Sequence, residues 1–115
     1  MKQFLVQYVA YNLWANEQIL NTLLEQPPVV WHENIPSSFP TLFKTVLHMW
    51  DAESIWWQRV QGAVSLEIPS KVFTGDEIAL VNGLKEQDRQ WLAWVQALPD
   101  EGTQKMIRYK NILFI

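Results

Sequence analysis

Prolines and glycines divide this chain into three long stretches in which apolar residues recur every three or four positions. The first stretch covers residues 2–26 and ends at Pro27-Pro28, because proline cannot continue a helical hydrogen-bond ladder. The second covers residues 38–62, and the third covers residues 74–98, just before Pro99. A period of three to four residues is that of an amphipathic α-helix. The spacing predicts three helices of roughly 22–25 residues, each about 35 Å long, and favours an antiparallel bundle.

The boundaries of these stretches carry recognisable end signals. Ser38 is placed to cap the second helix with Pro40 in its first turn, and Gly62 is suited to a left-handed residue after its end. The segment 27–38 is predicted to be a loop that Trp31 anchors to the body of the protein. After Pro99 the pattern changes, and residues 106–111 alternate as in extended chain.

Each predicted helix carries polar residues within its apolar stripe. Asn12 and Asn16 interrupt the first stripe, Glu53 the second and Asp88 the third. Buried polar groups are usually satisfied within the core, so we expect Asn12, Asn16 and Glu53 to form a polar network. A buried arginine is an alternative partner for Glu53, and this carboxylate could also serve as a metal ligand or as an acid or base. Asp88 is expected to be an exposed or edge residue of its stripe, and the alternative is a functional residue.

Composition narrows the class of protein. The chain has 115 residues, of which 49% are hydrophobic and 18% charged, which indicates one folded domain. The net charge of −3 and the scattered basic residues argue against binding to nucleic acid. No apolar run approaches the roughly 18–20 residues of a membrane span. The chain has no cysteine and therefore no disulfide or thiolate site. We expect a soluble cytoplasmic domain that does not contact membranes.

Seven tryptophans are far more than usual for a chain of this length. Aromatic residues at helical spacing are usually core residues, although five of them could also line a ligand pocket. These five are Trp50, Trp56, Trp57, Trp91 and Trp94. Their faces are too wide for a core of three helices. We therefore expect a further helix or a partner to cover an open Trp-rich side.

His48 is the first candidate for chemistry, because Asp51 lies three residues later and could orient its ring. A metal site requires three or four ligands, and the other histidine, His32, lies in the predicted loop. The alternative is a structural histidine that is partly buried and bonded to Asp51 or to the backbone.

Two segments resemble a known family. They are Tyr11-Asn12-Leu13-Trp14-Ala15-Asn16 in the first helix and the run from Thr45 to Arg59 (TVLHMWDAESIWWQR) in the second. These resemble the signatures of the DinB-like, damage-inducible family of four-helix bundles, which includes mycothiol- and bacillithiol-dependent transferases. The resemblance implies an all-α, up-down helical bundle with three long helices present and a fourth missing or supplied by a partner. Residues 1–115 would then form one domain that ends before the last helix of the family.

The resemblance also implies a function. His48 matches the first of three histidines that bind a divalent metal, Zn, Ni or Fe, and the other two belong to the final helix of the family. We expect no metal, or only weak binding, at this single ligand position. The chain is interpreted as a relative of metal-dependent enzymes that transfer a small thiol, with an incomplete metal site. Whether it is itself an enzyme stays open at this point.

The alternative is an interaction module without enzymatic activity. In this interpretation the open Trp-rich face is buried by self-association, with residues 112–115 exchanged between the two copies of a homodimer.

Overall fold

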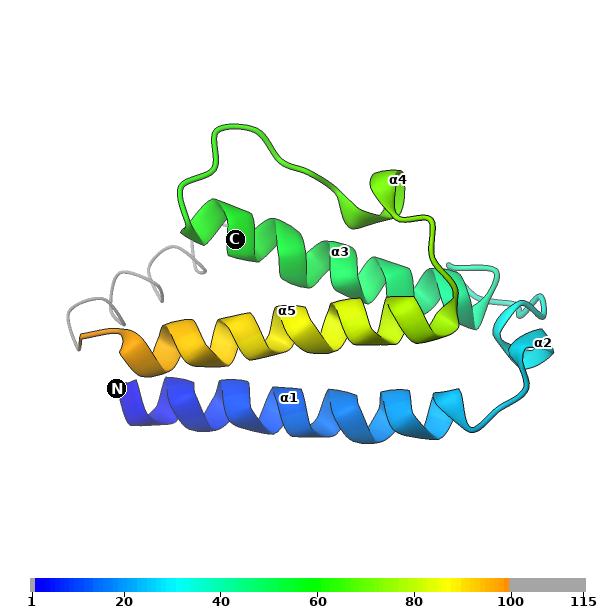
Figure 1. The fold of residues 1–115 in the computed structure, drawn as a ribbon, viewed down its shortest axis with the longest axis horizontal. Helices are drawn as coiled ribbons and strands as arrows, with labels where there is room; N and C mark the ends of the chain where they lie inside the picture. The colour runs from blue at the N-terminus through cyan, green and yellow to red at the C-terminus, as the bar shows by residue number, and fades with distance from the viewer. Residues whose placement is uncertain (1, 100–115) are drawn as a thin grey trace.

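The computed structural model describes residues 2–99, and every regular element in this part of the chain is a helix (Figure 1). The long helices are α1 (Lys2–Leu24), α3 (Leu42–Val60) and α5 (Glu77–Ala97). The short helices α2 (Pro28–Trp31) and α4 (Pro69–Val72) lie in the connections. The predicted all-α bundle with three long helices is confirmed. The predicted extended segment 106–111 and residues 112–115 lie outside the described residues.

The direction of the long helices is set by the connection from α3 to α5. Residues 61–76, with α4, cross back along the bundle, so that α3 and α5 run in the same direction and α1 runs opposite to both (Figure 1). The contacts follow this order: Trp57 of α3 packs edge-on against Trp91 of α5. Asn16 of α1 pairs with Asp88 of α5. The expected antiparallel arrangement therefore holds for α1 against α3 and α5, whereas α3 and α5 run parallel because of the long connection between them.

The central helix of the bundle is α5. It packs against both α1 and α3 and carries seven buried residues, whereas α1 and α3 carry two each. Gly83 allows α3 to approach, because a Cβ atom at this position would lie 2.5 Å from Cη2 of Trp50. A residue on the α5 stripe is therefore enclosed from both sides.

Local capping decides where the long helices begin and end. Thr41, not Ser38, caps α3 by accepting the Lys44 N–H at 3.1 Å. The prediction of a start at Ser38 is wrong because the chain before Thr41 forms a turn, in which the Ile35 N–H donates to the Pro40 carbonyl at 2.8 Å. Gly62 has a φ of +85°, which confirms the predicted left-handed residue after α3.

Trp31 anchors the connection between α1 and α3. Its side chain is 1% exposed, and its indole N–H donates to the Leu23 carbonyl at 3.0 Å. The predicted loop 27–38 thus contains one helical turn, α2, and the predicted anchor is confirmed. His32 follows it, stacks on Phe43 and bonds to Glu77 in the first turn of α5.

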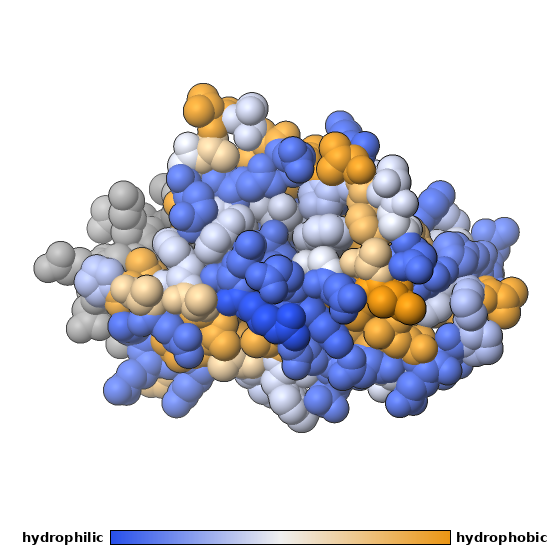
Figure 2. Space-filling model, viewed as in Figure 1, coloured by the Kyte–Doolittle hydropathy of each residue, from blue (hydrophilic) through white to orange (hydrophobic). Residues whose placement is uncertain are grey.

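Two apolar clusters occupy opposite ends of the three-helix layer. We call the cluster near α2 the closed end; it consists of Leu20, Trp31, Val46, Leu80, Val81 and Leu84. We call the other cluster the tryptophan end; it consists of Val9, Trp91 and Val95 with the partly buried Trp56, Trp57 and Trp94 packed against them. The seam between α1 and α5 is bridged by polar pairs, among them Arg89 with Glu17 at 3.2 Å. Figure 2 shows hydrophilic side chains gathered over the middle of this face of the bundle.

No helix within residues 2–99 combines the length and the apolar character that crossing a membrane requires.

Candidate functional site

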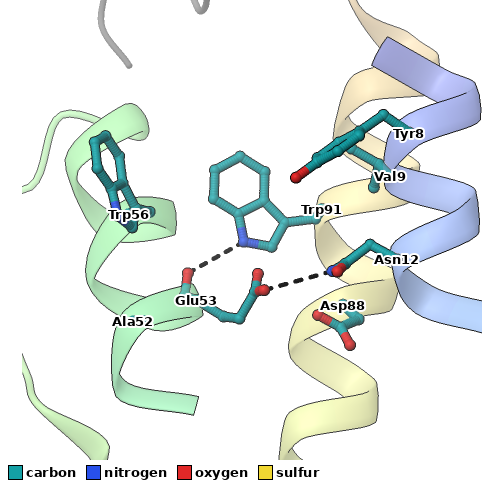
Figure 3. Close-up of a pocket in the computed structure, with 8 residues that line it drawn as sticks. All are labelled: Tyr8, Val9, Asn12, Ala52, Glu53, Trp56, Asp88 and Trp91. Atoms are coloured by element: carbon teal, nitrogen blue, oxygen red, sulfur yellow. Dashed lines mark hydrogen bonds between the residues drawn. The ribbon is translucent and has the colours of Figure 1, made fainter. Parts of the chain in front are cut away.

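A pocket of about 260 Å³ opens at the tryptophan end, between α1, α3 and α5 (Figure 3). Each long helix contributes to its lining. The lining residues are Tyr8, Val9 and Asn12 of α1, Ala52, Glu53 and Trp56 of α3, and Asp88 and Trp91 of α5. The pocket therefore depends on the packing of all three helices.

Aromatic rings form the walls of the pocket. Trp91 is 5% exposed and donates its indole N–H to the Glu53 carbonyl at 3.1 Å, which ties α5 to α3. Its ring also packs edge-on against Trp57, with the centroids 5.3 Å apart. Figure 3 shows Trp91 between Trp56 on one side and Tyr8 on the other, with the Tyr8 hydroxyl directed into the pocket. Trp91 is thus a core residue that also lines a cavity, and the half-buried Trp56 lines the same cavity.

Asparagines of α1 meet the two acidic residues of the pocket. Asn12 Nδ2 donates to Glu53 Oε1 at 3.5 Å, a long hydrogen bond, and Asn16 Nδ2 donates to Asp88 Oδ2 at 2.9 Å. The predicted polar network is present, and it also includes Asp88, which was not among its expected members. Each asparagine donates to a carboxylate on a different neighbouring helix.

Asp88 is the most unusual residue of the site. It is 1% exposed, so the expected exposed edge position is wrong; the reason is that α5 lies between the other two long helices. Burial raises its pKa from the ordinary value of 3.8 to about 7; the Asn16 hydrogen bond opposes this shift, and the negative charges of Glu53 and Glu17 add to it. Its Oδ1 atom is buried and has no hydrogen-bond partner. A buried acceptor without a donor is rare in folded proteins.

His48 lies on α3 one helical turn before Ala52, a residue of the pocket lining. Its side chain is exposed, and its ring stacks on Phe39 at a centroid distance of 4.4 Å. The expected pairing with Asp51 is wrong: Asp51 accepts the Ser70 N–H at 2.8 Å and so holds the start of α4. Within residues 2–99 the His48 ring nitrogens form no hydrogen bond.

These residues do not assemble a metal centre by themselves. Residues 2–99 contain no group of three or more histidine, cysteine, aspartate or glutamate side chains arranged to hold a metal ion. His32 bonds to Glu77 at the closed end, whereas His48 stacks on Phe39. A bound zinc ion needs three or four protein ligands, so the described part of the chain does not fit such a centre.

A second hollow lies between α3, α5 and the connection that contains α4. Two of its lining residues are used for structure: the Gln58 side chain donates to the Glu67 carbonyl at 2.6 Å and accepts the Glu67 N–H at 2.8 Å. This pair holds the connection against α3, so these polar groups serve the fold.

The position of Asp88 on the apolar stripe is visible in the sequence, but the sequence does not show whether the residue is buried. Asp88 occupies a stripe position, three residues before Trp91 and four after Leu84, and both of these neighbours are buried. An acid on an apolar stripe is either at its edge or at a functional position, and only the packing of α5 distinguishes the two. Tyr8 belongs to the pocket without any comparable signal.

Comparisons with a family model and with a curated protein both identify the DinB family. A family model described as the DinB family matches residues 1–80. Protein DinB of Bacillus subtilis (strain 168) is 33% identical over 87 residues, which covers 76% of this chain and 45% of that protein. The match therefore covers less than half of the length of this curated relative. No solved structure matches the chain.

Proposed function

This chain belongs to the DinB family, and on that premise we propose that it is a relative of the metal-dependent thiol transferases in which His48 is the one metal ligand that residues 2–99 supply. One observation carries the proposal: the exposed His48 ring has no hydrogen bond within the described residues and lies one turn from the pocket lining. A neutral imidazole with a free nitrogen is able to bind a metal ion. A site of family type needs further ligands from outside residues 2–99.

Zn²⁺ titration of the chain, followed by the imidazole NMR signals, tests this assignment. We expect the His48 signals to respond at lower Zn²⁺ concentration than those of His32, because Glu77 and Phe43 already engage the His32 ring. His48→Ala is expected to abolish the first response, whereas the matched variant His32→Ala keeps it. A response at His32 first, or one that survives His48→Ala, would show that His48 is not the ligand.

The second candidate function is a self-associating interaction module, and an exposed aromatic face of α1 favours it. Phe4, Tyr8, Tyr11 and Trp14 are 73%, 65%, 66% and 57% exposed. Phe4, Tyr8 and Tyr11 follow helical spacing and lie on one face. Aromatic residues are enriched in protein interfaces. The other tryptophans are buried or half-buried, so within residues 2–99 the exposed aromatic face of α1 contains a single tryptophan.

Light scattering at micromolar concentration tests self-association. We expect a dimer that the double substitution Tyr8→Ser and Tyr11→Ser converts to monomer. Val64→Ser is the matched control, because Val64 is fully exposed but lies outside α1. A wild-type monomer, or a dimer that tolerates the α1 substitutions, would exclude this face as the interface.

A further inference from the structure

We propose that the hollow between α3, α5 and the connection that contains α4 binds a small neutral ligand, a carboxamide carried on an aromatic ring. The hollow has a volume of about 450 Å³, which lies within the usual range of small-molecule pockets, about 300–1,000 Å³. It shares no lining residue with the pocket at the tryptophan end. The site depends neither on His48 nor on the exposed face of α1.

The outer wall of the hollow is fixed to α3 by more than the Gln58 pair. The Ser70 N–H donates to the Asp51 carboxylate at 2.8 Å. The Phe73 ring packs edge-on against Trp50, with the ring centroids 5.4 Å apart. A site whose walls are held in place before binding loses less free energy when a ligand is ordered in it.

Two buried polar side chains line the hollow and have hydrogen-bonding capacity that the fold does not use. Ser54 is 8% exposed and Gln87 is 7% exposed. The Ser54 hydroxyl accepts from Gln58 Nε2 at 3.0 Å, but its own O–H donates to no group within residues 2–99. The Gln87 amide donates to Gln90 Oε1 at 3.1 Å, and its Oε1 atom has no donor among the described residues. Unlike Asp88 Oδ1, this oxygen is not sealed from solvent, so a ligand is able to reach it.

A carboxamide matches this pair of groups. Its carbonyl accepts the O–H of Ser54, and its N–H donates to Oε1 of Gln87. A site with one donor and one acceptor discriminates against a ligand that lacks either complementary group, because the unmatched group then loses its water without a replacement.

The rest of the lining favours a neutral ligand with a ring. Trp50 and Phe73 present aromatic surface, and Pro69 and Val72 add aliphatic surface. Aromatic side chains pack well against a further ring in offset or edge-on geometry. Glu67 is the one charged residue of the lining and is exposed, so it disfavours an anion and contributes little to the binding of a cation.

Binding of benzamide to the wild-type chain, compared with binding of acetophenone, tests the proposal. Acetophenone keeps the ring and the carbonyl but has a methyl group in place of the amide nitrogen. In NMR spectra, the indole N–H of Trp50 and the side-chain amide of Gln87 report on the hollow, and the indole N–H of Trp91 reports on the other pocket. We expect benzamide to bind about fivefold more tightly, as one net hydrogen bond implies. Equal affinities, tighter binding of acetophenone, absence of binding, or a response at Trp91 instead of Trp50 would overturn the proposal.

A pair of matched variants locates the effect. Gln87→Met removes the amide and keeps a side chain of similar length, and Gln96→Met makes the same change at an exposed position of α5 outside the hollow. We expect the preference for benzamide to fall below about twofold in Gln87→Met and to stay at about fivefold in Gln96→Met. An unchanged preference in Gln87→Met, or equal losses in both variants, would overturn the assignment. If Gln87→Met does not fold, the wild-type comparison of the two probes decides alone.

Discussion

The two ends of the bundle are built from the same three helices, yet they differ in what fills them. At the closed end, six residues that are no more than 2% exposed meet, and all of them are aliphatic except Trp31, whose indole N–H is bonded to the Leu23 carbonyl. At the tryptophan end, large rings meet at steep angles, and the pocket with Glu53 and Asp88 opens beside them. The closed end contains six buried cluster residues and the tryptophan end three, so we expect the closed end to contribute more to stability.

Asp88 and Asn16 lie between the closed end and the tryptophan end. Along α5 the stripe passes from Leu80, Val81 and Leu84 to Asp88 and then to Trp91. The buried acid therefore stands where the aliphatic packing ends and the pocket begins. Asn16 satisfies one oxygen of Asp88, whereas the other is buried without a hydrogen-bond partner.

The largest difference between the ends is expected in stability. Trp31→Ala removes a side chain that is 1% exposed and leaves a cavity at the closed end, which we expect to cost about 3–5 kcal/mol. Trp94→Ala, at the tryptophan end, removes a partly buried ring and is expected to cost roughly 1–2 kcal/mol. Urea unfolding measures both changes. Equal losses for the two tryptophans would show that the ends contribute alike.

Asp88 predicts a pH dependence of stability that arises at the tryptophan end. Its pKa is raised from 3.8 to about 7 on folding, so between these values the folded protein binds more protons than the unfolded one. The free energy of unfolding contributed by Asp88 therefore falls as pH rises from about 4 to about 7. A shift of about three units corresponds to at most about 4 kcal/mol.

Urea unfolding across this pH window, with Asp88→Asn beside the wild type, measures this contribution. The variant keeps an acceptor for Asn16 and is expected to be more stable than the wild type above pH 7. Its stability should also lack the Asp88 part of the pH slope. Identical slopes in the two proteins would mean that Asp88 stays ionised throughout.

A smaller effect is expected at Gly83, where α3 and α5 approach each other closely. Gly83→Ala places a Cβ atom 2.5 Å from the Trp50 ring, and overpacking of this kind costs about 1–3 kcal/mol. Alanine gains about 1 kcal/mol in helix propensity, which offsets part of the loss. In a double-mutant cycle, Trp50→Leu should relieve the clash, so that Gly83→Ala becomes neutral or stabilising in that background. Simple additivity of the two substitutions would contradict the contact.

The sequence by itself determined the elements that depend on local interactions. Apolar periodicity located the three long helices to within a few residues, and Gly62 marked the end of α3 because a positive φ favours glycine. Trp31 was identified as the anchor of its loop, and the motifs around Asn12 and His48 indicated the family that the comparisons show. The start of α3 was misplaced because Ser38 and Thr41 carry equivalent capping groups. Only the turn closed by Ile35 and Pro40 selects between them.

The tertiary structure determines that α5 is the central helix, and the central position of α5 buries Asp88. The crossover through α4 makes α3 and α5 parallel and encloses α5 between its neighbours, so that an acid on its stripe is buried beside Asn16. The same crossover brings the Ser70 N–H to the Asp51 carboxylate, so Asp51 bonds to the start of α4 and not to His48. Such pairings depend on the direction and rotation of helices that are distant in sequence. Local periodicity contains neither quantity.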